Sequence, residues 1–149
     1  MNVRTLAVLA LPVAILVSAC STASSPVSGV ASPPAESASS TTRTSDGGQV
    51  TVVADWAGPA AGAVFDVKLD THSVDLDALV LSDAVLRNDR SEMLTTQPWS
   101  APKGGHHRAG SLTFEGDAAS FFAGARWIEL ALPGVGDIPE RTLRWELGA

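Results

Sequence analysis

From Val50 to the end of the chain, apolar and polar residues alternate in short runs that are broken by glycine and proline. The clearest run is 65–70, in which Phe, Val and Leu alternate with Asp, Lys and Asp. Successive side chains of a strand point to opposite faces, so this period of two predicts half-buried strands and not helices. We therefore expect a domain that is mostly β.

Seven short strands are predicted from this alternation. They are expected within residues 49–53, 65–70, 79–86, 93–99, 111–115, 127–132 and 142–147. The spacing in 79–86 also permits a helical turn, and 118–125 has a helical pattern. Short strands separated by Gly, Pro and Asp turns are typical of an all-β antiparallel β-sandwich of immunoglobulin-like architecture. A seven-strand barrel is the alternative fold.

The segment before these strands has a different composition. Residues 21–48 consist largely of Ser, Thr, Ala, Pro and Gly, and they contain no aromatic residue. Such a segment buries too little apolar surface to offset the entropy that ordering it would cost. We therefore expect residues 20–48 to form a flexible tether and residues 49–149 to form the folded domain.

The N-terminal segment has the features of a signal peptide. Arg4 precedes an apolar run, 6–17, whose length suits a signal peptide better than a bilayer span. Val17, Ser18, Ala19 and Cys20 follow, and this order resembles the lipobox of bacterial lipoproteins.

This resemblance implies that residues 1–19 are removed and that the thiol of Cys20 carries a diacyl group of the palmitate type. The protein would then be held at the extracytoplasmic side of the bacterial cell membrane, because two acyl chains hold a protein durably. The alternative is an ordinary secretory signal with an incidental cysteine.

Cysteine content and charge exclude several classes of protein. Cys20 is the only cysteine, so a lipidated chain has no thiol left for disulfides, Fe–S clusters or cysteine-bound zinc. The formal net charge is −6 at pH 7. Nucleic acid is therefore not an expected partner, because its binding depends on Lys and Arg that neutralise phosphates.

Three strings stand out from the strand pattern: LDTHSVDLD at 69–77, GGHHRAG at 104–110 and ERTLRWEL at 140–147. Together they resemble segments of uncharacterised extracytoplasmic bacterial domains, often lipoproteins. The resemblance covers most of residues 50–149. It implies a compact secreted domain and carries no known activity.

The histidines are candidate metal ligands. If successive strands run up and down, His72, His106 and His107 fall at one end of the domain, together with Asp70 and Asp75. Imidazole and carboxylate groups suit Cu or Zn. Adjacent histidines in an extended chain point to opposite sides, so His106 and His107 face one ion only if the glycine-rich loop turns between them. The alternative is that all three bond to the main chain at strand ends.

Trp99 is a candidate ligand-binding residue. It lies between Pro98 and Pro102, and prolines hinder regular strand pairing, so among the tryptophans its ring is the candidate for exposure. Packing of the ring against the glycine-rich loop is the alternative. Trp145 lies on the apolar face of the last strand and is expected in the core.

The sequence predicts no enzyme. Ser111, His106 and Asp117 supply the residue types of a nucleophile, a base and an acid, but the Gly-x-Ser-x-Gly motif is absent. We expect a membrane-anchored extracytoplasmic protein that acts as a non-enzymatic binding or accessory domain, without a cofactor, for an unidentified protein partner in the cell envelope. The alternative is a metal-binding accessory protein that uses the histidines to hold Cu or Zn.

Overall fold

The computed structural model describes residues 41–148. The expected signal peptide, Cys20 and most of the expected tether lie outside the described residues. Within residues 41–148, no helix has the length and apolar character that crossing a membrane requires.

The described part of the chain is almost entirely β. Its elements are the strands β1 (Thr42–Gly47), β2 (Val50–Asp55), β3 (Val64–Thr71), β4 (Val85–Asn88), β5 (Met93–Thr96), β6 (His107–Glu115), β7 (Trp127–Val135) and β8 (Ile138–Glu146), with the short helices η1 (Pro59–Ala61) and α1 (Ala118–Phe122).

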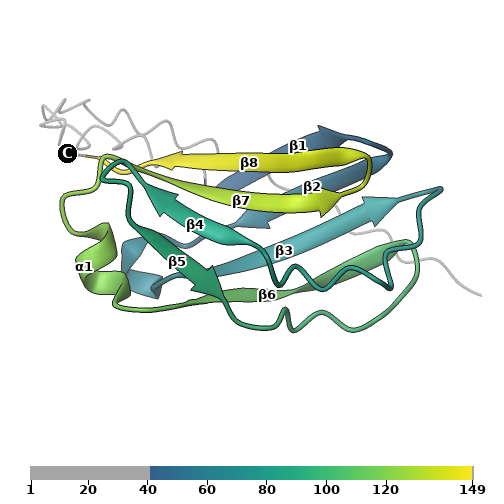
Figure 1. The fold of residues 1–149 in the computed structure, drawn as a ribbon, viewed down its shortest axis with the longest axis horizontal. Helices are drawn as coiled ribbons and strands as arrows, with labels where there is room; N and C mark the ends of the chain where they lie inside the picture. Colours follow the sequence, from purple (N-terminus) through teal and green to yellow (C-terminus); the bar gives the residue numbers. More distant parts are fainter. Residues whose placement is uncertain (1–40, 149) are drawn as a thin grey trace, which may run out of the picture. The chain divides into compact units, whose positions relative to one another are not determined.

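The eight strands form one nearly closed antiparallel sheet in the order β1-β2-β3-β6-β5-β4-β7-β8 (Figure 1). β6 joins the two halves of this sheet. Its residues from His107 to Thr113 pair with β3, whereas Phe114 and Glu115 pair with β5. The expectation of an antiparallel all-β domain is confirmed.

The connections between antiparallel strands gather at two ends of the sheet (Figure 1). The loop end comprises the connections 48–49, 72–84, 97–106 and 136–137. The opposite, entry end comprises Thr41, η1, the connection 89–92, α1 and residues 147–148.

The alternation that predicted the strands also predicts the core. In β3, Phe65, Val67 and Leu69 are fully buried, whereas the residues between them are exposed. At the entry end the core is aromatic, because the ring of Trp56 lies 5.7 Å from that of Phe65 and 6.2 Å from that of Trp145. Trp145 is buried, as expected.

β1 lies inside the segment that was expected to be tether. The ordered domain therefore begins before Gln49, and the number of strands is eight where about seven were expected. None of the side chains of β1 is buried. Its backbone pairs with β2 from Thr42 to Gly47. A polar strand of this kind gives no apolar alternation, so the pattern did not reveal it.

The third expected strand is only partly present. β4 begins at Val85, and the expected range 79–86 is wrong over its first six residues. Leu81 has a φ of 50°, which extended backbone does not permit. Turn hydrogen bonds from Leu79 N to Leu76 O and from Ala84 N to Leu81 O replace strand pairing. The fourth strand also ends early, at Thr96.

Candidate functional site

Arg108 of β6 is buried at the loop end, with 6% of its surface exposed. Its guanidinium donates hydrogen bonds to four main-chain carbonyls, those of Leu76, Leu79, Ala101 and Pro102. Two of these carbonyls belong to the connection 72–84 and two to the connection 97–106. One buried side chain therefore holds both long loops against the sheet.

Trp99 packs against the same guanidinium, which lies 4.6 Å from the centre of its ring. The ring is 8% exposed, and its N–H donates to the carbonyl of Gly110 at 3.1 Å. The interpretation of Trp99 as an exposed ligand-binding residue is therefore wrong, and its packing against the glycine-rich segment, the other expectation, is confirmed. The connection folds back over β6 so closely that a Cβ on Gly110 would lie 2.4 Å from the nitrogen of Ala101. The prolines end the strand, but the ring turns inward.

Arg141 of β8 is a second buried arginine near the loop end, and it bonds to the strands that flank the two short turns. It is 2% exposed and donates hydrogen bonds to the carbonyls of Val135, Ser45 and Gly47. Burial lowers the pKa of Arg141, and the charge of Asp46 opposes that shift. Arg108 therefore fixes the two long connections, whereas Arg141 ties β8 to β7 and β1 beside the two short turns.

Asp77 links the two long loops a second time. Its Oδ1 accepts hydrogen bonds from the backbone N–H groups of Gly104 and Gly105, each at 2.9 Å. These bonds, that from Gly105 first, hold the pKa of Asp77 below its ordinary value. Its charged form is therefore the one that organises the loops.

All three histidines lie at the loop end, as the expected strand order required, but the structure does not gather them around one point. His107 Nδ1 lies 2.7 Å from Oδ1 of Asp70, its cross-strand partner. His106 Nδ1 lies 3.0 Å from the carbonyl oxygen of Val74. His72 is exposed.

The remaining candidate ligand, Asp75, accepts a hydrogen bond from the backbone N–H of Asp77 at 2.9 Å. Of the expected ligands, the structure thus brings His107 and Asp70 into contact. Among the residues that the structure describes, no three His, Cys, Asp or Glu side chains form a group that could hold a metal ion.

The three residues with catalytic chemistry are distributed over the domain. Ser111, in the middle of β6, donates a hydrogen bond to Asp66 at 2.9 Å. Asp117 caps the N-terminus of α1 at the entry end, where it accepts from the N–H and hydroxyl of Ser120. His106 lies at the loop end. They do not assemble a nucleophile, a base and an acid.

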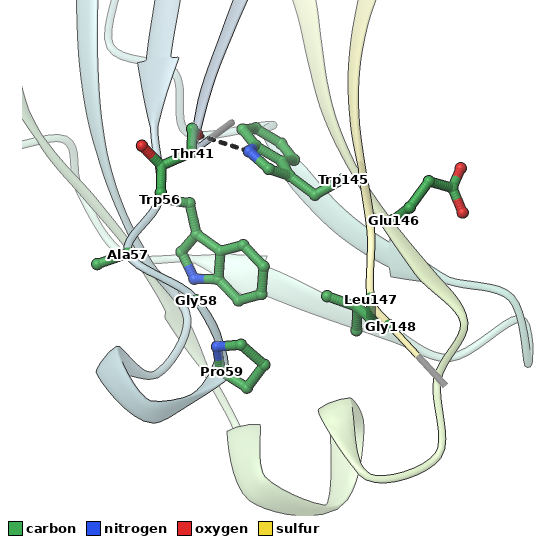
Figure 2. Close-up of a pocket in the computed structure, with 9 residues that line it drawn as sticks. All are labelled: Thr41, Trp56, Ala57, Gly58, Pro59, Trp145, Glu146, Leu147 and Gly148. Atoms are coloured by element: carbon green, nitrogen blue, oxygen red, sulfur yellow. Dashed lines mark hydrogen bonds between the residues drawn. The ribbon is translucent and has the colours of Figure 1, made fainter. Parts of the chain in front are cut away.

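A recess of about 290 Å³ opens at the entry end between β2 and β8 (Figure 2). Trp56 and Trp145 form its walls, and Pro59 and Leu147 lie at its rim. The indole N–H of Trp145 donates to the carbonyl of Thr41 at 2.7 Å, and that of Trp56 donates to a carbonyl of the adjacent loop. Both tryptophan donors are therefore used inside the domain, and the recess offers a ligand mainly apolar surface.

Comparison of the chain with protein-family models, with curated proteins and with solved structures gave no match.

Proposed function

We propose that this chain is a bacterial lipoprotein, anchored through Cys20 at the extracytoplasmic face of the cell membrane, and that its β domain is a non-enzymatic binding module. The observation that carries the proposal is that one buried side chain, Arg108, fixes the two long loop-end connections. Irregular connections as long as 72–84 usually have a function. Loops that are already ordered lose little entropy when a partner binds.

The entry end sets the orientation of this module. Thr41 lines the recess at the entry end, so we propose that a tether from Cys20 joins the domain on that side. β8 is nine residues long, which at about 3.3 Å per residue places the loop end about 30 Å from the entry end. In this proposal the loop end faces away from the lipid, towards a protein partner in the cell envelope.

We further propose that the sheet is a sandwich of immunoglobulin-like architecture. In support, β1, β2 and β3 pair in succession and join one half of β6 through β3, while β5 pairs with the other half of β6. The side chains of Phe65 and Trp145, from the two halves, pack with ring centres 5.2 Å apart. Such packing is expected where two sheets face each other.

Photo-crosslinking in cells that express the full chain tests the binding surface. A photoreactive amino acid is placed at Ser73 or at Lys103, both exposed at the loop end, and at Ala119 on α1 as the matched control. We expect discrete crosslinked products from the two loop-end positions and none from position 119. Equal yields at all three positions, or products from position 119 alone, would contradict the proposal.

A transition-metal role at the loop end is the second candidate. The observation in its favour is the contact between His107 and Asp70, which puts an imidazole and a carboxylate side by side. An ion held by these two side chains would need further ligands from His72, His106 or water. Titration with Cu(II) and Zn(II), described below, separates this candidate from the first.

A further inference from the structure

The sheet has a seam where its first and last strands meet. β1 and β8 stand at the two ends of the strand order, and no main-chain ladder between them is found within residues 41–148. Side chains bridge the seam instead. Trp145 and Arg141 of β8 donate to carbonyls at 41, 45 and 47, and Arg43 Nε of β1 donates to the carbonyl of Arg144 at 2.5 Å.

The groups that hold β1 at this seam recognise its main chain. Arg141 donates to the carbonyl oxygens of Ser45 and Gly47, groups that every residue carries, and β1 buries no side chain of its own. We define the slot as the space that β1 occupies between β2 and β8. The bonds from Arg141 recognise an extended strand by its backbone, as in strand addition to a sheet edge, and the Arg43 side chain adds a contact that depends on the sequence of β1.

An empty slot would be energetically unfavourable. Arg141 is almost completely buried, and two of its hydrogen-bond acceptors, Ser45 and Gly47, belong to β1. If β1 left without a replacement, part of a buried guanidinium would lose its partners, which is strongly unfavourable. Removal of β1 is therefore tied to its replacement by another strand.

The turn that joins β1 to β2 carries backbone strain. Gly48 has a φ of 50° and Gln49 a φ of 63°, and the left-handed region is unfavourable for a residue such as glutamine. The main-chain carbonyl of Gln49 accepts from the hydroxyl of Thr71 at 2.6 Å, which helps to hold this conformation. Opening of the hairpin would release the strain.

We propose that two copies of this chain exchange β1, each inserting Thr42–Gly47 into the slot of the other. A second copy supplies the same strand to the same donors, so Arg141 keeps its acceptors in the exchanged dimer. Short, strained hinges favour this kind of exchange over the closed monomer. The partner surface is the slot, and the occupant is β1 of the second copy.

Shortening the hinge tests the proposal. Deletion of Gly48 and Gln49 prevents β1 from turning back onto its own β2. Sedimentation velocity of the full chain in detergent should then show a dimer with an unchanged β-type circular dichroism spectrum. Arg141→Lys in the deletion background should weaken the dimer at least about tenfold, whereas Arg144→Lys, its matched control on the same strand, should not. A folded monomer of the deletion variant would overturn the proposal, as would a dimer that Arg141→Lys leaves unchanged.

The second measurement uses the unshortened hinge and stands even if the deletion variant fails to fold. Isotopically light and heavy pools of the wild-type chain are mixed, incubated just below the unfolding temperature and analysed by native mass spectrometry. Mixed dimers should form, and Gln49→Gly, which removes the strain, should lower their yield about fivefold or more. Absence of mixed dimers at every concentration, or an equal yield from Gln49→Gly, would overturn the exchange.

Discussion

The guanidinium of Arg108 stacks on the indole of Trp99 at 4.6 Å, in the interior of the loop end. Cation–π attraction is stronger for desolvated pairs than for exposed ones. The same guanidinium also satisfies four loop carbonyls, so loss of this one side chain affects both long connections. The conformation of the proposed binding surface thus depends on Arg108, which is buried beneath that surface.

Arg108→Met should lower the free energy of unfolding by about 2–4 kcal/mol, because buried carbonyls lose their donor and Met cannot replace it. Urea denaturation followed by tryptophan fluorescence measures the change. Arg144→Met is the matched control, since Arg144 lies 3.9 Å from the Trp127 ring on the surface. The Arg144→Met substitution should lower the free energy of unfolding by about 1 kcal/mol or less. Equal losses for the two variants would show that Arg108 does not organise the loops.

A chain that starts at Gln49 lacks β1 and should be less stable than one that starts at Thr41 by about 3–5 kcal/mol. The main reason is that Arg141 would lose the carbonyls of Ser45 and Gly47 while it stays buried. Thermal unfolding of the two chains measures the difference. If they unfold at the same temperature, β1 is not part of the stable domain.

Asp77 should make the loop end sensitive to acid. Hydrogen bonds from Gly105 and Gly104 lower its pKa in the folded state. The stabilisation that the charged carboxylate gives to the loop end is thus complete above the ordinary carboxyl pKa of about 3.9. It is lost as the pH falls through the lower pKa that Asp77 has in the folded state. The protection of the Gly104 and Gly105 amides against hydrogen exchange, relative to the intrinsic rate at each pH, should decrease as the pH falls across that range.

Asp77→Asn should show fast exchange at Gly104 and Gly105 without this pH step. Asp66→Asn, on the face of the sheet, is the control and should keep the wild-type profile. A wild-type profile in Asp77→Asn would show that the carboxylate does not hold the loop.

Much of this fold could be predicted from the period of two in the sequence. β2, β3, β7 and β8 follow from their alternating residues, and an antiparallel order was enough to place the three histidines at one end. β1 was missed because its polar side chains carry no alternation. β4 was extended too far because nothing in Leu79–Leu81 signals a positive φ at Leu81.

The two buried arginines were also missed, although the alternation contains a signal for them. Arg108 has the same parity as Leu112 and Phe114, and Arg141 has the same parity as Leu143 and Trp145. Each arginine therefore falls on the inward face of its strand. What the sequence alone does not supply is the set of acceptors, because half or more of the carbonyls that satisfy each guanidinium come from segments distant in the chain, 76–79 for Arg108 and 45–47 for Arg141.

Calorimetric titration with Cu(II) and Zn(II) tests the metal candidate. With one imidazole and one carboxylate in contact, we expect weak binding. His107→Ala and Asp70→Asn should abolish it, whereas His72→Ala should not change it. Tight binding that requires His72 together with His106 would instead favour the metal-binding function.

Metabolic labelling with a fatty acid analogue tests the membrane anchor, on which the proposed orientation of the domain depends. The wild-type chain should carry the label, and the label should be absent from Cys20→Ala, which keeps the rest of the lipobox and the whole β domain. A wild-type chain without label, or a label that persists in Cys20→Ala, would contradict the account of this protein as a lipid-anchored binding module.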